Sequence, residues 1–71
     1  MPSYPEMLRA ARERAGFTRE ALANELTRTA DIIRHYEAGR VRPPHNVRVR
    51  LAHLLDEPAL LDAPDTTAAG K

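Results

Sequence analysis

Glycine and proline divide this chain into short pieces, and this division constrains the fold more than any other feature of the sequence. The breaks fall at Gly16, Gly39, Pro43, Pro44 and Pro58. Glycine favours the left-handed cap that ends a helix, and the residue before a proline avoids the helical conformation. Between the breaks, apolar residues recur every three or four positions, which is the period of an amphipathic helix. The pattern therefore predicts an all-α protein made of short helices.

Capping residues place the expected helices along the chain. Ser3 and Glu6 have the spacing of a capping box, while Thr18 and Thr29 are N-cap candidates for the second and third helices. The expected helices run from the Ser3–Glu6 box to Gly16, from Thr18 to Leu26, from Ala30 to Ala38, from His45 to Leu55, and from Pro58 through Leu60 and Leu61. The second and third are joined by the short turn Thr27–Arg28–Thr29. We expect one domain over residues 1–63 and a flexible tail over 64–71.

The length and composition exclude several classes of protein. With 71 residues and no cysteine, the chain has no disulfide scaffold, no thiolate zinc site and no cysteine nucleophile. A bundle this small offers little concavity for a catalytic pocket, and we expect no enzyme activity, no cofactor and no small-molecule substrate. His35, His45 and His53 lack the spacing of a metal site. The absence of an apolar span or signal peptide predicts a cytoplasmic protein that does not bind membranes.

The charges are distributed unevenly. Residues 9–50 hold ten arginines and five acidic residues, a net charge of +5, whereas residues 51–71 carry −3. A basic body indicates an anionic partner such as nucleic acid. An ordinary solvated helical surface in an arginine-rich chain explains the same numbers, so charge alone leaves both interpretations open.

The third expected helix carries a polar face. At 100° per residue, Asp31, Arg34 and His35 lie on one side, opposite Ile33, and Ala30 begins the helix. A helix fits the major groove of DNA, where arginine donates to guanine, aspartate accepts from the amino group of cytosine, and alanine contacts the thymine methyl group. The competing interpretation is a face that is merely solvated.

Residues 8–55 resemble the Xre-type helix-turn-helix family, which includes phage repressors and Cro proteins. The matching positions are Leu8-Arg9, Arg12, Gly16-Phe17-Thr18-Arg19-Glu20-Ala21-Leu22-Ala23, Leu26, Thr29, Ile33, Tyr36-Glu37-Ala38-Gly39-Arg40, Pro43, Leu51-Ala52 and Leu55. The resemblance implies a compact five-helix, lambda-repressor-like bundle that binds double-stranded operator DNA, usually as a dimer. By that analogy, the third helix reads bases in the major groove.

The resemblance also assigns roles to individual positions. It implies base contacts from Thr29, Ala30, Asp31, Arg34 and His35, and phosphate contacts from Thr18, Arg19, Arg40 and Arg42. It implies a structural ion pair between Arg12 and Glu37. Arg28 stands in the turn, within expected reach of a phosphate.

Three departures from the family pattern stand out. Thr27 occupies a turn position that usually holds glycine, and a β-branched residue disfavours the left-handed conformation, so we expect a different turn. Arg48 stands where the family buries an aliphatic residue, a role that passes to Val47 or Val49. Asp31 carries the wrong charge for a DNA surface unless it meets a cytosine amino group, which favours selective over non-specific binding.

We therefore expect a sequence-specific transcriptional regulator that acts as a homodimer, associated with the nucleoid when bound to DNA, with a regulatory partner protein as a further expected contact. Leu60 and Leu61 form either a lid on the monomer core or the dimer interface, and the sequence favours neither. The alternative function is a protein-interaction module, an adaptor or antitoxin-like protein that uses the same fold to dock a partner. Ile32 motivates it, because this large aliphatic residue has no evident role in the core.

Overall fold

The computed structural model describes residues 3–62, which form five α-helices and no strand. The helices are α1 (Tyr4–Arg14), α2 (Arg19–Leu26), α3 (Ala30–Ala38), α4 (His45–Leu54) and α5 (Ala59–Asp62). The all-α fold predicted from the sequence is confirmed, with small differences in bounds: α4 ends at Leu54 instead of Leu55, and α5 begins at Ala59 instead of Pro58. The tail expected over 64–71 lies outside the described residues.

Local hydrogen bonds begin the helices where the sequence places them. The backbone amide of Ser3 donates to Oε1 of Glu6 at 3.1 Å. The Thr18 hydroxyl accepts from the amide of Ala21 at 3.0 Å. The Thr29 hydroxyl accepts from the amide of Ile32 at 3.3 Å. Each contact satisfies an amide that the first helical turn leaves without an intrahelical partner.

Residues in the left-handed conformation end α1, α2 and α3. Gly16 and Gly39 have φ of 81° and 79°, a conformation that glycine adopts without steric cost. Thr27 also adopts it, with φ 57° and ψ 45°, so the expectation of a different turn is wrong. The turn holds because the amides of Thr27 and Arg28 donate to the carbonyls of Asn24 and Ala23 at 3.2 and 2.8 Å. These bonds close α2 in spite of the unfavourable side chain.

Replacing Thr27 by glycine should therefore stabilise the protein. A left-handed L-residue costs about 1–2 kcal/mol, and the entropy that glycine loses on folding offsets about half of this. We expect Thr27→Gly to raise the free energy of unfolding by about 1 kcal/mol in urea titrations. Thr27→Ala keeps a β-carbon in the left-handed region and should give no comparable gain. Equal stabilisation by both variants would contradict this account of the turn.

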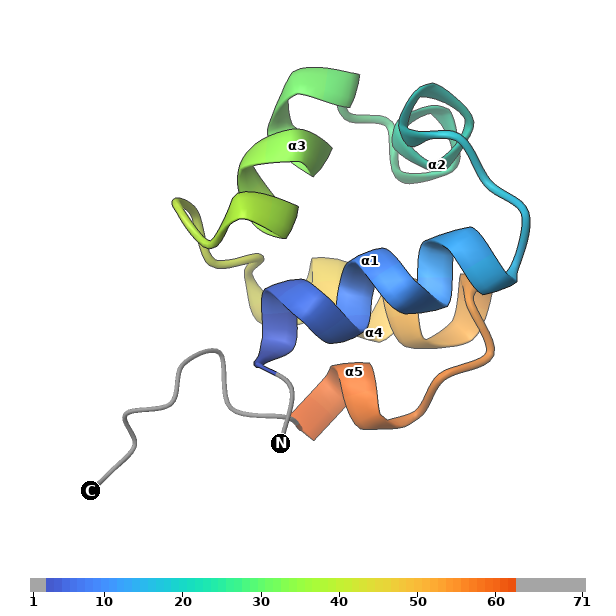
Figure 1. Cartoon of the computed structure of the whole chain (residues 1–71), viewed down its shortest axis with the longest axis vertical. Coiled ribbons are helices and arrows are strands. Elements are labelled where there is room, and N and C mark those ends of the chain that lie inside the picture. The colour runs from blue at the N-terminus through green and yellow to red at the C-terminus, as the bar shows by residue number, and fades with distance from the viewer. Residues whose placement is uncertain (1–2, 63–71) are drawn as a thin grey trace.

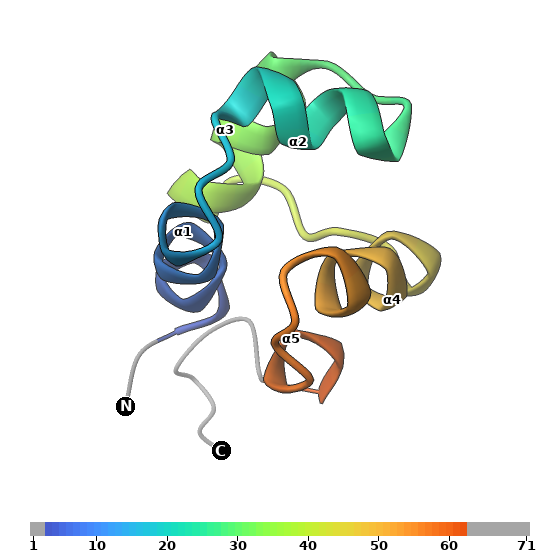
Figure 2. The same ribbon diagram turned by 90° about the vertical axis from the view of Figure 1, so that its right-hand side faces the viewer.

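The helices form two groups joined by α1. Figures 1 and 2 show α2 and α3 together at one end, α5 at the other, and α1 and α4 between them. The largest fully buried side chains come from all five helices and are Tyr4, Leu8, Leu22, Ile33, Leu51 and Leu60. Ile32 is partly buried and packs against this core, so the expectation that it has no core role is wrong. Leu60 is a core residue and is not available to a second chain.

Arg48 is partly buried, and its positive charge lies close enough to act on the buried Tyr4. Val47 is buried, as the sequence predicted for one of the two valines, and Val49 is partly exposed. The hydroxyl of Tyr4 and the Nε of Arg48 are both buried and have no hydrogen-bond partner. Burial raises the pKa of Tyr4 from 10.0 to about 12, and the positive charge of Arg48 opposes part of this shift.

The raised pKa predicts that the fold weakens at alkaline pH. Because the folded state favours the neutral phenol, the stabilisation is complete below pH 10 and is lost as the pH rises from 10 towards 12. A shift of this size corresponds to about 2–3 kcal/mol. Tyr4→Phe should remove this part of the pH dependence and cost little at pH 7, because the hydroxyl has no partner to lose. Urea titrations at pH 7 and pH 11 test this, and an unchanged alkaline loss would contradict it.

Candidate nucleic-acid interface

The outer face of α3 presents the polar residues selected from the sequence. Asp31 and Arg34 are exposed, and Ala30 and His35 are partly exposed. The opposite side of the helix buries Ile33 and Tyr36 against the core. The Thr29 hydroxyl is engaged in capping, so its oxygen already accepts one hydrogen bond. The structure therefore brings all five predicted base-contacting residues to the start and outer face of one helix.

Three of these residues contact one another. Oδ1 of Asp31 accepts a hydrogen bond from Nη2 of Arg34, one helical turn along α3. The other carboxylate oxygen, Oδ2, lies 3.3 Å from Nε2 of His35. The helical projection predicted that these side chains share one face, but not that they contact one another. Spacings of three and four residues on a helix bring side chains into contact, and this signal was present in the sequence.

A shallow depression lies between the beginnings of α2 and α3. It has a volume of about 330 Å³, and its lining residues are Arg19, Glu20, Ala30, Asp31 and Arg34. Residues predicted to contact phosphate and residues predicted to contact bases therefore share one surface. Both charge signs occur there, so the depression is not a simple cationic patch.

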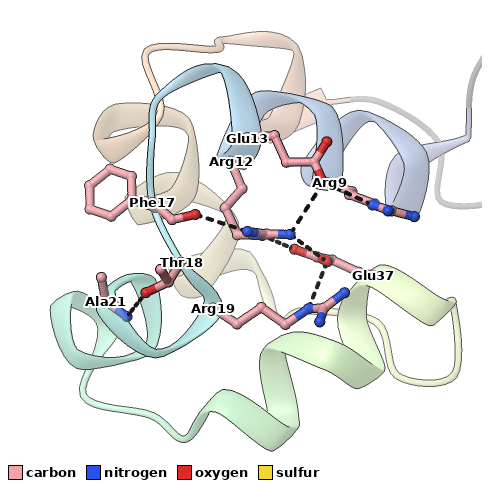
Figure 3. A network of polar contacts seen from close by, with 8 residues as sticks. All are labelled: Arg9, Arg12, Glu13, Phe17, Thr18, Arg19, Ala21 and Glu37. Atoms are coloured by element: carbon pink, nitrogen blue, oxygen red, sulfur yellow. Dashed lines mark hydrogen bonds and ion pairs between the residues drawn. The ribbon is translucent and has the colours of Figure 1, made fainter.

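A buried carboxylate joins three helices behind this surface. Figure 3 shows Glu37 of α3 between Arg12 of α1 and Arg19 of α2. Nε of Arg12 donates to Oε2 of Glu37 at 2.6 Å, and Nε of Arg19 donates to Oε1 at 3.1 Å. Nη1 of Arg12 also donates to the carbonyl of Phe17 at 2.8 Å. The Glu37 side chain is only 3% exposed, so these contacts offset the cost of burying its charge.

Arg19 has a role that the sequence analysis did not foresee. The family analogy placed it on phosphate, whereas its Nε is committed to Glu37. Its side chain is still 41% exposed, and it also lines the depression. Arg19 therefore links the buried ion pair to the candidate surface. No local pattern signals this, because the contact joins residues 18 positions apart.

The remaining candidates for phosphate contact flank α3. Arg28 lies in the turn before the helix, Arg40 and Arg42 follow its end, and all three are exposed. The Thr18 hydroxyl caps α2 and is also at the surface. A duplex that accepts α3 in its major groove presents its phosphates on both sides of the helix. This placement matches what such a complex requires.

A second, more apolar surface lies on α4 and α5. A depression of about 300 Å³ is lined by Val49, Ala52, His53, Asp56, Pro58 and Leu61. Leu61 is partly exposed there, in contrast to the buried Leu60. Of the two leucines considered for a dimer contact, only Leu61 is accessible.

Neither a metal site nor a membrane span is found in the described region. Residues 3–62 contain no group of three histidine, cysteine or acidic side chains placed to hold a metal ion. Within the same range, every helix is too short or too polar to cross a bilayer.

One comparison with known proteins identifies the architecture. The family model for a helix-turn-helix domain matches residues 6–63, which is most of the chain. This agrees with the Xre-type resemblance and with the arrangement of α2, the left-handed turn and α3. Comparisons with curated proteins and with solved structures returned no match. At the level of the domain, the match indicates a DNA-binding regulator.

Proposed function

Because this chain belongs to the helix-turn-helix domain family, we propose that it is a sequence-specific, DNA-binding transcriptional regulator. The observation that carries this proposal is the surface of α3. Its outer face holds exposed side chains of the types that can bind base edges, and exposed arginines lie before and after the helix. A helix face that is only exposed to solvent does not require arginines on both sides of it.

Two sets of residues have different tasks in this proposal. Thr18, Arg28, Arg40 and Arg42 bind phosphates and set the orientation of the domain on the duplex. Arg19 adds the guanidinium nitrogens that do not bind Glu37. The residues at the start and outer face of α3 determine the base preference, through base contacts or by positioning a neighbour that makes one; these are Thr29, Ala30, Asp31, Arg34 and His35. Phosphate contacts contribute affinity without sequence information, whereas base contacts distinguish one site from another.

We further propose that the chain binds DNA as a homodimer. One short recognition helix reads too few base pairs to specify a genomic site, and two helices about 34 Å apart read successive major grooves. The depression on α4 and α5 is the candidate contact between the copies. His53 and Asp56 lie in its lining among apolar side chains, and an adjoining depression that shares Val49 and His53 continues the surface to Arg50. A two-fold contact would place the same apolar lining of both copies face to face. The protein then acts in the cytoplasm, on the nucleoid when bound to an operator.

A charge placed in this depression should separate dimerisation from folding. Leu61→Glu should weaken self-association and lower DNA affinity about tenfold or more, because a carboxylate is costly to bury in an apolar contact. The thermal midpoint should change little, since Leu61 is only partly buried. Analytical ultracentrifugation and gel-shift titration measure the two effects. Loss of folding would instead make Leu61 a core residue, and unchanged association would exclude this surface.

The proposed function itself is tested by selection from duplexes with a randomised centre. The full chain should enrich one sequence, which a gel shift then confirms in the presence of excess scrambled competitor. Failure to enrich any sequence would favour the alternative of a protein-interaction module. That alternative has lost the observation that motivated it, because Ile32 packs against the core.

A further inference from the structure

We infer that Asp31 is a positioning residue, which orients Arg34 to bind a guanine and does not itself accept a hydrogen bond from a base. This inference rests on the proposed function and identifies one base that the site reads. It replaces the direct contact between Asp31 and cytosine that the residue type alone predicted.

The contacts of Asp31 support this inference first. Its carboxylate is engaged on its own helix, since Oδ1 accepts a hydrogen bond from Nη2 of Arg34 and Oδ2 lies 3.3 Å from Nε2 of His35. A direct contact with cytosine would have to compete with these contacts or share an oxygen. A positioning role requires no change in either contact.

The donors of Arg34 support it second. A guanidinium has five N–H groups in a fixed plane, and guanine accepts two parallel hydrogen bonds at O6 and N7. Asp31 contacts Arg34 through Nη2 alone. Nη2 carries two hydrogens, one on each side, so a single bond to Asp31 leaves one complete two-donor edge free. Arg34 can therefore hold Asp31 and bind guanine at the same time.

The exposure of the pair supports it third. The side chains of Asp31 and Arg34 are both 61% exposed, and an ion pair between exposed groups adds little to folding stability. A carboxylate beside a phosphate backbone also weakens DNA binding. Stability explains Asp31 only in part, because a carboxylate in the first turn of α3 gains a small stabilisation from the helix dipole whether or not Arg34 is present, and affinity does not explain its contact with Arg34. Selectivity does, because Asp31 limits the directions in which Arg34 can donate and neutralises its attraction to the wrong sequences.

A double-mutant cycle separates positioning from direct reading. The full chain, Asp31→Ala, Arg34→Ala and the double variant are titrated against the selected duplex and against copies in which each guanine is replaced by 7-deazaguanine, which lacks the N7 acceptor. In the unsubstituted chain, one replacement should weaken binding about 5- to 150-fold, the range of a bidentate arginine contact. Asp31→Ala should reduce this penalty several-fold. In the Arg34→Ala background, removing Asp31 should change nothing further at that base.

Glu20→Ala is the matched control. Glu20 is an exposed carboxylate in the lining of the same depression. Its removal should strengthen binding to all duplexes alike and leave the 7-deazaguanine penalty unchanged. Thermal unfolding of each variant, followed by circular dichroism, shows that the comparison is made on folded protein.

Two results would overturn the inference. If Asp31→Ala changes base preference equally with and without Arg34, Asp31 reads a base directly. If Asp31→Ala behaves like Glu20→Ala, the contact with Arg34 has no part in recognition. Failure of the proposed function is distinct, because the unsubstituted chain would then select no duplex.

Discussion

Replacing Glu37 by alanine is expected to cost about 3–5 kcal/mol of folding stability, the usual penalty when one partner of a buried ion pair is removed. The Arg12 side chain is 10% exposed and would keep its charge without the carboxylate that compensates it. Small domains often have little more than about 5 kcal/mol in total. The thermal midpoint should therefore fall by about 15 °C or more, as measured by circular dichroism or calorimetry.

Glu13→Ala provides the control for this prediction. Glu13 also lies near Arg12, with Oε2 3.8 Å from Nη2, but its side chain is 55% exposed. Its removal should cost less than about 1 kcal/mol, because exposed ion pairs contribute little. A second test replaces both buried partners, with Arg12→Met and Glu37→Leu together. This pair should recover much of the lost stability, whereas equal effects of the two single glutamate variants would show that burial does not set the cost.

The helices were predictable because their ends are encoded locally. Thr18 and Thr29 cap, and Gly16 and Gly39 terminate, through contacts within a few residues. The stripe of apolar side chains on each helix follows from the same short-range pattern. The bounds of α3, Ala30–Ala38, were therefore predicted correctly, as was the exposure of Asp31 and Arg34, whereas the contact of Ile32 with the core was not.

The contacts between helices were not predictable in the same way. Arg19 turns to Glu37 because the fold brings the start of α2 beside the end of α3, and no local pattern encodes that distance. Thr27 accepts a left-handed conformation because hydrogen bonds at the end of α2 outweigh its own preference. Propensity is a weak predictor where tertiary contacts decide.

The second large expected effect is a steep loss of DNA affinity as the salt concentration rises. If Arg28, Arg40 and Arg42 each neutralise a phosphate, a dimer makes six such contacts, and the slope of log affinity against log salt should be about −5. Raising the salt from 50 to 200 mM should then weaken binding about 10³-fold. Fluorescence anisotropy with a labelled duplex measures the slope directly.

Arg28→Ala tests one of these contacts. The variant should reduce the slope to about −4, because a dimer loses two contacts, and should weaken the selected and scrambled duplexes by the same factor. Arg14→Ala is the matched control, since Arg14 is equally a charged surface residue but pairs at 2.7 Å with Glu57, in the segment between α4 and α5. Its slope should equal that of the unsubstituted chain. A loss of base preference in Arg28→Ala would place Arg28 among the residues that read sequence, and an unchanged slope would remove it from the interface. Arg34→Ala should show the opposite behaviour, with an altered base preference and a nearly constant salt slope. The two variants together therefore divide α3 and its flanking residues into a part that sets affinity and a part that sets specificity.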